Sequence, residues 1–487
     1  MLFNSFQFII FFPIVLLIYY IIPKKIRMYW LLISSYYFYM CWNVKYVLLI
    51  LTSTIVTYIS GLLLEQSKHR KLIVAGSFVI NLGILGYFKY ANFFLNSISI
   101  LFSKLGVTLN APSFDILLPV GISFYTFQAL SYTMDVYRND IYAERNFFKY
   151  ALFVSFFPQL VAGPIERSKN LLKQLSFDNR FDYDSARNGF VIMLWGYFLK
   201  LVLADRIAIF VDTIYNDPSL YQGWYIVVAT FLFGIQIYCD FYGYSTIAMG
   251  AAQILGIRLM ENFHAPYLAT SVAEFWRDWH ISLTSWFKDY LYIPLGGSRH
   301  GTLRKYTNKM IVFLVSGLWH GASLSFIVWG GINGLYQIIG EITQSVRLAI
   351  AAKLKLSPNS MSSRLFRTIT TFILVDFAWL FFRAGTMPKA IVLIKNMFSI
   401  YNPWILFDGS IFECGLNARN FWLMIICIAI LLYADVCKKR GIVVSHVILK
   451  QDLWCRYLVL ILAICAILTF GIWGSNYDAS GFIYFQF

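Results

Sequence analysis

Long apolar segments separated by short polar or basic stretches make up most of this chain. These segments fall at about residues 5–22, 28–42, 45–64, 72–95, 116–133, 147–162, 189–210, 224–239, 243–256, 310–340, 368–382, 420–436 and 454–473. About 20 apolar residues suffice for a helix to cross the hydrocarbon core of a bilayer. Continuous apolar runs indicate helices, because strands of a membrane barrel alternate in polarity. The pattern predicts an all-α polytopic membrane protein with roughly 11–13 transmembrane helices.

Composition supports this prediction and excludes a soluble globular domain. The 487 residues are 59% hydrophobic and only 13% charged, and the mean hydropathy is +0.64. In a soluble protein, the net charge of +16 would suggest nucleic-acid binding. Here basic cytoplasmic loops explain the charge, and we expect no nucleic-acid partner. The seven cysteines contain no CxxC pair, so we interpret them as small buried hydrophobic residues.

The basic clusters predict the topology. Lys and Arg gather at 24–27, 68–71 and 438–440, which the positive-inside rule places in the cytoplasm. The N-terminus and the C-terminal tail, residues 474–487, are then extracytoplasmic. The first apolar segment lacks a basic n-region and a small-residue cleavage site, so we interpret it as a retained helix. Residues 1–487 show no internal repeat and are expected to form a single integral membrane domain.

His320 is the only Asp, Glu, Lys, Arg or His between residues 310 and 340. An ionisable group at membrane depth is costly and usually faces a cavity with a function. Burial disfavours the charged imidazolium, and a neutral imidazole can accept a proton. His320 is therefore a candidate general base. The structural alternative is a histidine that only hydrogen-bonds a neighbouring carbonyl.

The segment around His320 is too long for one straight span. Its 31 residues would cover about 46 Å as a helix, against roughly 30 Å of hydrocarbon. We therefore expect a tilted, bent or broken helix, and the segment holds five glycines, at 317, 321, 330, 331 and 334. Segment 152–168 is expected to break as well, at Pro158 and at Gly163-Pro164, which makes a re-entrant element plausible there.

Residues 264–300 interleave charges with aromatic side chains. Ser271 followed by Glu274 is a capping-box pattern, and Pro294 would end the helix that it begins. At helical spacing one face would hold Trp276, His280, Leu283 and Phe287, and the opposite side would hold Glu274, Arg277, Asp278, Lys288 and Asp289. The segment is too polar to cross lipid, so we expect a buried or interfacial amphipathic helix. His280 is a second candidate for chemistry, with a structural role as the alternative.

The remaining polar candidates carry weaker patterns. Asp240 and Asp376 lie in apolar surroundings, where a structural ion pair with Arg or Lys is the more common role. His69 and His300 lie in basic loops. No carboxylate stands at ligand spacing to His280 or His320, so no metal site is predicted.

Five motifs in this sequence resemble the membrane-bound O-acyltransferase (MBOAT) family, in particular its bacterial alginate O-acetyltransferase-like branch. They are SGLWHG around His320, EFWRDWHISLTSWFKDYLYIPLGG around His280, DFYGYS at Asp240, PVGISFYTFQ from Pro119, and FFPQLVAGPIER. The signature region covers about residues 116–340. The two signature histidines of the family correspond to His280 and His320.

The resemblance implies a ring of helices with re-entrant elements around a thin centre, with a funnel or tunnel opening to each face. Acetyl-CoA would be the acyl-donor substrate from the cytoplasm, with no bound cofactor, and the acceptor would lie outside. His320 would act as general base, and His280 would orient the acceptor or polarise the carbonyl. Residues that would support the site or line the substrate are Trp276, Arg277, Asp278, Trp319 and Asp240.

The tail ends in FIYFQF, and Tyr484 within it is a candidate acyl relay. A phenol ester is a more activated acyl donor than an alkyl ester, so such a relay is chemically sensible. An interfacial aromatic anchor is the alternative. The resemblance further implies the bacterial cytoplasmic membrane, an extracytoplasmic SGNH/esterase-like O-acetyltransferase partner and a surface polysaccharide as final acceptor.

Two other functions remain open at this point. Teichoic acid D-alanylation occurs in the same family, although this chain departs from it in length and in its FIYFQF ending. A transporter or flippase for a cell-envelope precursor would predict paired halves with matching broken helices, and the sequence shows no such repeat. The sequence does not identify the acceptor polymer.

Overall fold

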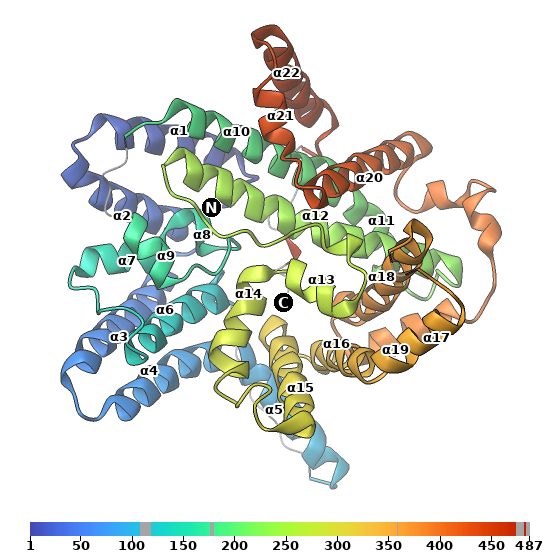
Figure 1. Ribbon diagram of the computed structural model, residues 1–487, viewed down its shortest axis with the longest axis horizontal. Helices are drawn as coiled ribbons and strands as arrows, with labels where there is room; N and C mark the ends of the chain where they lie inside the picture. Colours follow the sequence, from blue (N-terminus) through green and yellow to red (C-terminus); the bar gives the residue numbers. More distant parts are fainter. Residues whose placement is uncertain (108–117, 176–179, 358, 474–481, 484–487) are drawn as a thin grey trace. The chain divides into compact units, whose positions relative to one another are not determined.

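The computed structural model describes residues 1–107, 118–175, 180–357, 359–473 and 482–483. In these ranges helices are the only regular secondary structure, which confirms the predicted all-α fold (Figure 1). The chain divides into two compact units, Met1–Phe190 with Ala248–Met260, and Val191–Ile247 with Glu261–Phe487.

Six helical stretches of the described chain are long and apolar enough to cross a membrane. They are Val44–Gln66, Arg70–Lys104, Trp224–Ile254, Met361–Ala384, Ala418–Lys439 and Leu453–Phe470. A shorter apolar helix, α1, covers Phe6–Ile21. The protein is therefore a multi-pass membrane protein. Several other apolar segments of the sequence are divided into shorter helices.

The first unit is built around α6, which packs against α3 and α4. Gly61 of α3 allows the ring of Tyr132 on α6 to approach its backbone closely. The predicted interruption between 152 and 168 is confirmed, since α7 ends at Ser155 and only the short α8 intervenes before α9. The helices of this unit, besides α1, are α2 (Lys24–Met40), α3 (Val47–Gln66), α4 (Arg70–Leu85), α5 (Ala91–Lys104), α6 (Ile122–Tyr137), α7 (Phe147–Ser155), α8 (Phe157–Leu160) and α9 (Ser168–Gln174).

The second unit contains both candidate catalytic histidines. Two helices, α10 (Tyr183–Tyr197) and α12 (Trp224–Ile254), run through both units. The other helices of this unit are α11 (Asp205–Asn216), α13 (Val272–Asp278), α14 (Ile281–Phe287), α15 (Gly301–His320), α16 (Leu324–Ile342), α17 (Gln344–Lys353), α18 (Met361–Ala384), α19 (Met387–Met397), α20 (Ala418–Lys439), α21 (Val444–Leu449) and α22 (Leu453–Phe470).

Helix α12 differs from the helices expected from the sequence. Segments 224–239 and 243–256 were expected as separate spans, but they form one helix of 31 residues. Gly243 does not end a helix. It lies where α12 meets α10, and a Cβ on Gly243 would stand 2.8 Å from the carbonyl oxygen of Gly196. Small residues at such contacts let two helix backbones approach closely.

Helices α15 and α16 form an antiparallel hairpin, so of the tilted, bent or broken helix expected in 310–340 the structure has the broken form. Helix α15 ends at His320, and α16 begins after the N-cap Ser323. Two glycines set the closeness of the pair: a Cβ on Gly317 would overlap the carbonyl oxygen of Phe326, and one on Gly330 would overlap that of Phe313. The hairpin thereby fixes the position of His320 at its turn.

Candidate active site

His320 is buried at the C-terminal end of α15, with 6% of its surface exposed. Its ring centroid lies 5.1 Å from Trp329 of α16 and 5.4 Å from Phe382 of α18, both in edge-on geometry. Three helices thus enclose this imidazole in an aromatic shell. Such a shell excludes water, which strengthens electrostatic interactions and suits a base that must act on a bound substrate.

His280 lies between α13 and α14 in a left-handed conformation, with φ 44° and ψ 53°. The predicted single helix from Ser271 to Pro294 is therefore wrong, because the chain breaks at Trp279–His280 and continues as a second helix. A non-glycine residue in this region is uncommon, and such residues cluster at functional sites. His280 is fully buried.

The break at His280 is held by contacts from a distant residue. Ile281 donates its backbone N–H to the carbonyl oxygen of Asn262 at 2.9 Å, and Ser282 donates to the side-chain oxygen of Asn262 at 3.4 Å. The predicted inward set of Trp276, His280, Leu283 and Phe287 is buried, although the break means that its members do not share one helix face.

Trp319 brings the two histidines into one cluster. Its ring centroid lies 6.2 Å from His280 and 4.8 Å from its neighbour His320. His280 also packs edge-on against Phe241 of α12 at 4.6 Å. Trp276 joins the cluster through Trp329, with their ring centroids 5.7 Å apart. Four of the residues singled out in the sequence, at 276, 280, 319 and 320, therefore meet in one aromatic core.

The electrostatic state of His280 follows from its burial. Burial lowers the pKa of His280 from 6.5 to about 3. Its imidazole is therefore neutral at neutral pH, so it can both donate and accept one hydrogen bond. This state suits a residue that orients an uncharged hydroxyl, whereas a charged imidazolium would be destabilised in this position.

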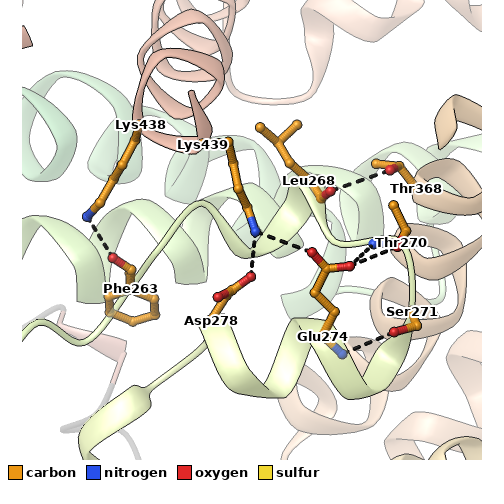
Figure 2. Close-up of polar contacts among 9 residues, drawn as sticks. All are labelled: Phe263, Leu268, Thr270, Ser271, Glu274, Asp278, Thr368, Lys438 and Lys439. Atoms are coloured by element: carbon orange, nitrogen blue, oxygen red, sulfur yellow. Dashed lines mark hydrogen bonds and ion pairs between the residues drawn. The ribbon is translucent and has the colours of Figure 1, made fainter. Parts of the chain in front are cut away.

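Helix α13, which carries the chain to His280, is tethered by a lysine from the end of α20 (Figure 2). The Lys439 ammonium lies 2.6 Å from Asp278 and 3.5 Å from Glu274. The Glu274 carboxylate also accepts hydrogen bonds from the N–H and hydroxyl of Thr270, both at 2.8 Å. The Ser271 hydroxyl caps the helix by accepting from the N–H of Glu274 at 3.1 Å, as the capping-box pattern predicts. Arg277 is exposed and lies outside this network.

Lys438 contacts the irregular segment between α12 and α13. It donates to the carbonyl oxygen of Phe263 at 2.8 Å and lies 3.0 Å from the carboxylate of Glu261 (Figure 2 shows the first contact). In the sequence, Lys438 and Lys439 are visible only as part of a basic cluster that indicates the orientation of the chain. Their partners lie some 160 to 180 positions away in the sequence, and the only signal was the basic pair itself.

The other predicted site residues lie as follows. Asp240 of α12 is buried and forms an ion pair with Lys200 at 2.6 Å, as expected for an acid in an apolar setting. Asp376 has no cation within ion-pair distance among the described residues. Tyr484 lies outside the described residues. Over the same described ranges, no group of three or more His, Cys, Asp or Glu side chains is arranged to hold a metal ion.

The fold and this histidine cluster define an integral membrane protein with two buried histidines packed in one aromatic cluster. The chain belongs to the MBOAT, membrane-bound O-acyltransferase family, whose profile matches residues 18–373. It is therefore an acyltransferase, and the matched region includes both histidines.

The sequence is also similar to curated relatives. The chain is 38% identical over 418 residues to "Probable alginate O-acetylase AlgI" of Azotobacter vinelandii, covering 84% of this chain and 80% of the relative. It is 34% identical over 400 residues to the peptidoglycan O-acetyltransferase of Helicobacter pylori, covering 76% and 73%. The teichoic acid D-alanyltransferase of Bacillus subtilis is 26% identical over 276 residues, covering 54% and 68%.

Proposed function

We propose that this protein transfers an acetyl group from cytoplasmic acetyl-CoA across the bacterial cytoplasmic membrane for O-acetylation of an extracytoplasmic polysaccharide. The observation that carries the proposal is the cluster of His280, Trp319 and His320 in the interior of a multi-pass membrane protein. The relatives that cover most of the chain are named as O-acetylating proteins, which supports acetyl as the group transferred.

The chemistry needs one base and one acyl carrier. His320 removes the proton from an acceptor hydroxyl while the oxygen of that hydroxyl attacks the thioester carbonyl of acetyl-CoA. The new C–O ester bond forms, the C–S bond breaks, and CoA leaves as a thiol after taking up the proton. General base catalysis of this kind contributes about 10²- to 10⁴-fold. His280, neutral and immobilised by burial, orients the hydroxyl or polarises the carbonyl.

The C-terminal tail offers a first acceptor. In this scheme the phenol of Tyr484 takes the acetyl group from the thioester, and the resulting phenyl ester passes it to the next hydroxyl while the phenol is regenerated. The proposal places the N-terminus and the tail on the extracytoplasmic side. There an SGNH/esterase-like transferase would receive the acetyl group and pass it to the surface polysaccharide.

Mass spectrometry of alkali-released acyl esters from the cell envelope tests this function. Cells that lack the protein are complemented with the wild type, with His320→Ala, or with His446→Ala as an exposed histidine control. The proposal expects acetate to be lost with His320→Ala and retained with His446→Ala. Loss of D-alanine in place of acetate would assign the chain to teichoic acid modification. An ester profile that is the same for His320→Ala and the wild type would overturn the role of His320 in the transfer.

A further inference from the structure

The second unit contains a buried charged cluster that the histidine site does not use. The Lys200 ammonium lies 2.6 Å from Asp240 and 2.8 Å from Asp205, and the side chains of Lys200 and Asp240 are 1% and 2% exposed. Buried ionic groups in membrane proteins are costly to maintain and commonly mark functional sites.

The backbone around Lys200 is arranged for this contact. Residues Phe198–Ala204 form a π-helical segment, a rare geometry that is frequent at functional sites. The helix contact at Gly196 and Gly243 lies next to it, and a Cβ on Gly243 would stand only 3.1 Å from the backbone nitrogen of Lys200. The close approach brings Lys200 and Asp240 together from two different helices.

The cluster is occupied by the C-terminal segment of the same chain. Ile483 donates its backbone N–H to the Asp240 carboxylate at 2.8 Å. The ring of Phe482 lies 4.7 Å from that of Tyr244, one helical turn after Asp240, and 5.8 Å from the Lys200 ammonium. Phe482 and Ile483 are 1% and 3% exposed. A hydrogen bond to an ionised acceptor in such surroundings is stronger than a neutral one.

The chain that leaves α22 is tied to the same π-helical region. Ile472 donates its N–H to the carbonyl oxygen of Leu201 at 3.0 Å, and Arg206 donates to the carbonyl oxygen of Phe470 at 2.8 Å. Residues 470 and 472, at and just after the end of α22, and residues 482–483 therefore contact the same part of the second unit.

We propose that Asp240, Lys200 and Tyr244 form a receptor for the C-terminal segment. This receptor recognises the amide of Ile483 and the aromatic ring of Phe482. Asp240 directly precedes Phe241, whose ring packs against His280, so the receptor adjoins the histidine cluster along α12. Asp240 is a positioning residue. Binding of the segment by this receptor does not depend on acyl transfer. Its use in presenting Tyr484 rests on the proposed function.

Cysteine labelling tests the receptor directly in the full-length protein purified in detergent. The seven native cysteines are replaced, Ile483→Cys is introduced, and the rate of reaction with N-ethylmaleimide is measured without acyl donor. We expect Asp240→Asn to raise this rate by about tenfold, because the charge-assisted hydrogen bond is lost. The matched control is Asp435→Asn, which removes an equally buried carboxylate of the same unit whose hydrogen bond is with Tyr238. An unchanged rate in Asp240→Asn, or an equal rise in both variants, would overturn the proposal.

A second pair of variants separates binding of the tail from general loss of folding. Ile483→Pro removes the N–H donor, whereas Ile483→Ala keeps it. The receptor predicts that acyl transfer by the proline variant falls at least about fivefold below that by the alanine variant, at equal thermal stability. Equal transfer by the two would contradict a role for the amide. If labelling supports the receptor but Tyr484→Phe retains full transfer, the receptor stands and the relay fails.

Discussion

The ammonium of Lys439, the last residue of α20, lies 2.6 Å from the carboxylate of Asp278, the last residue of α13. Asp278 is followed after one residue by His280, which has a left-handed conformation at the start of α14. The backbone carbonyl of Asp278 also accepts a hydrogen bond from the N–H of His264 at 2.9 Å. This ion pair therefore helps to position one of the two buried histidines.

We predict that Lys439→Met lowers the rate of acyl transfer by about tenfold, equivalent to about 1.4 kcal/mol at the transition state. The partly exposed ion pair itself contributes little to global stability, about 0–1 kcal/mol, so the thermal midpoint should change little. Lys450→Met, at an exposed position of the same unit, is the matched control. In a double-mutant cycle, Asp278→Asn should add little to Lys439→Met, since both remove one interaction. Fully additive losses would contradict coupling between the two residues.

The close packing of the hairpin that positions His320 predicts which of its glycines tolerate alanine. Gly330→Ala should destabilise the protein by about 1–3 kcal/mol and reduce transfer, because its Cβ would overlap the carbonyl oxygen of Phe313. Gly331→Ala is the matched control, since its Cβ would meet only the Leu314 side chain at 3.5 Å. Thermal unfolding and transfer rate of the two variants provide the measurement. Equal tolerance of alanine at both positions would show that close packing of α15 and α16 is not required.

The sequence could predict that residues 310–340 do not form one straight helix, because the cause is local. A largely apolar segment of 31 residues exceeds the membrane thickness, and its glycines mark positions where a helix can break or pack closely. The capping of α13 was equally visible, because Ser271 and Glu274 are three residues apart. In the structure, however, the Glu274 carboxylate accepts from Thr270 rather than from the N–H of the cap residue itself.

The break at His280 could not be predicted, because its cause is not local. Nothing in the local sequence opposes a continuous helix through Trp279 and His280. The helix is interrupted by hydrogen bonds to Asn262, a residue in another segment whose contacts depend on tertiary structure. The partner of Asp240 was hidden in the same way, because Lys200 stands 40 positions earlier and faces it only where α10 and α12 meet closely.

The neutral state of His280 predicts a dependence of stability on pH. Its folded pKa of about 3 lies below the ordinary 6.5, so below pH 6.5 the unfolded chain binds a proton that the folded protein does not. The free energy of unfolding therefore falls as the pH is lowered, by at most about 2 kcal/mol between pH 6.5 and about 5 from this residue.

His280→Gln should reduce this loss of stability, which thermal unfolding at about pH 7.5 and about pH 5 would measure. The exposed His446→Gln provides the control and should behave as the wild type. A His280→Gln protein with the same decrease in midpoint on acidification as the wild type would contradict a buried, neutral His280.

The role of His320 in acyl transfer can be measured with purified protein in liposomes. Labelled acetyl-CoA is supplied, and the initial rate of acetyl transfer is compared among the wild type, His320→Ala and His446→Ala, each with its thermal midpoint. Loss of a general base predicts a decrease of at least about 100-fold for His320→Ala at unchanged stability, with His446→Ala close to the wild type. A rate for His320→Ala within about threefold of the wild type would contradict the mechanism.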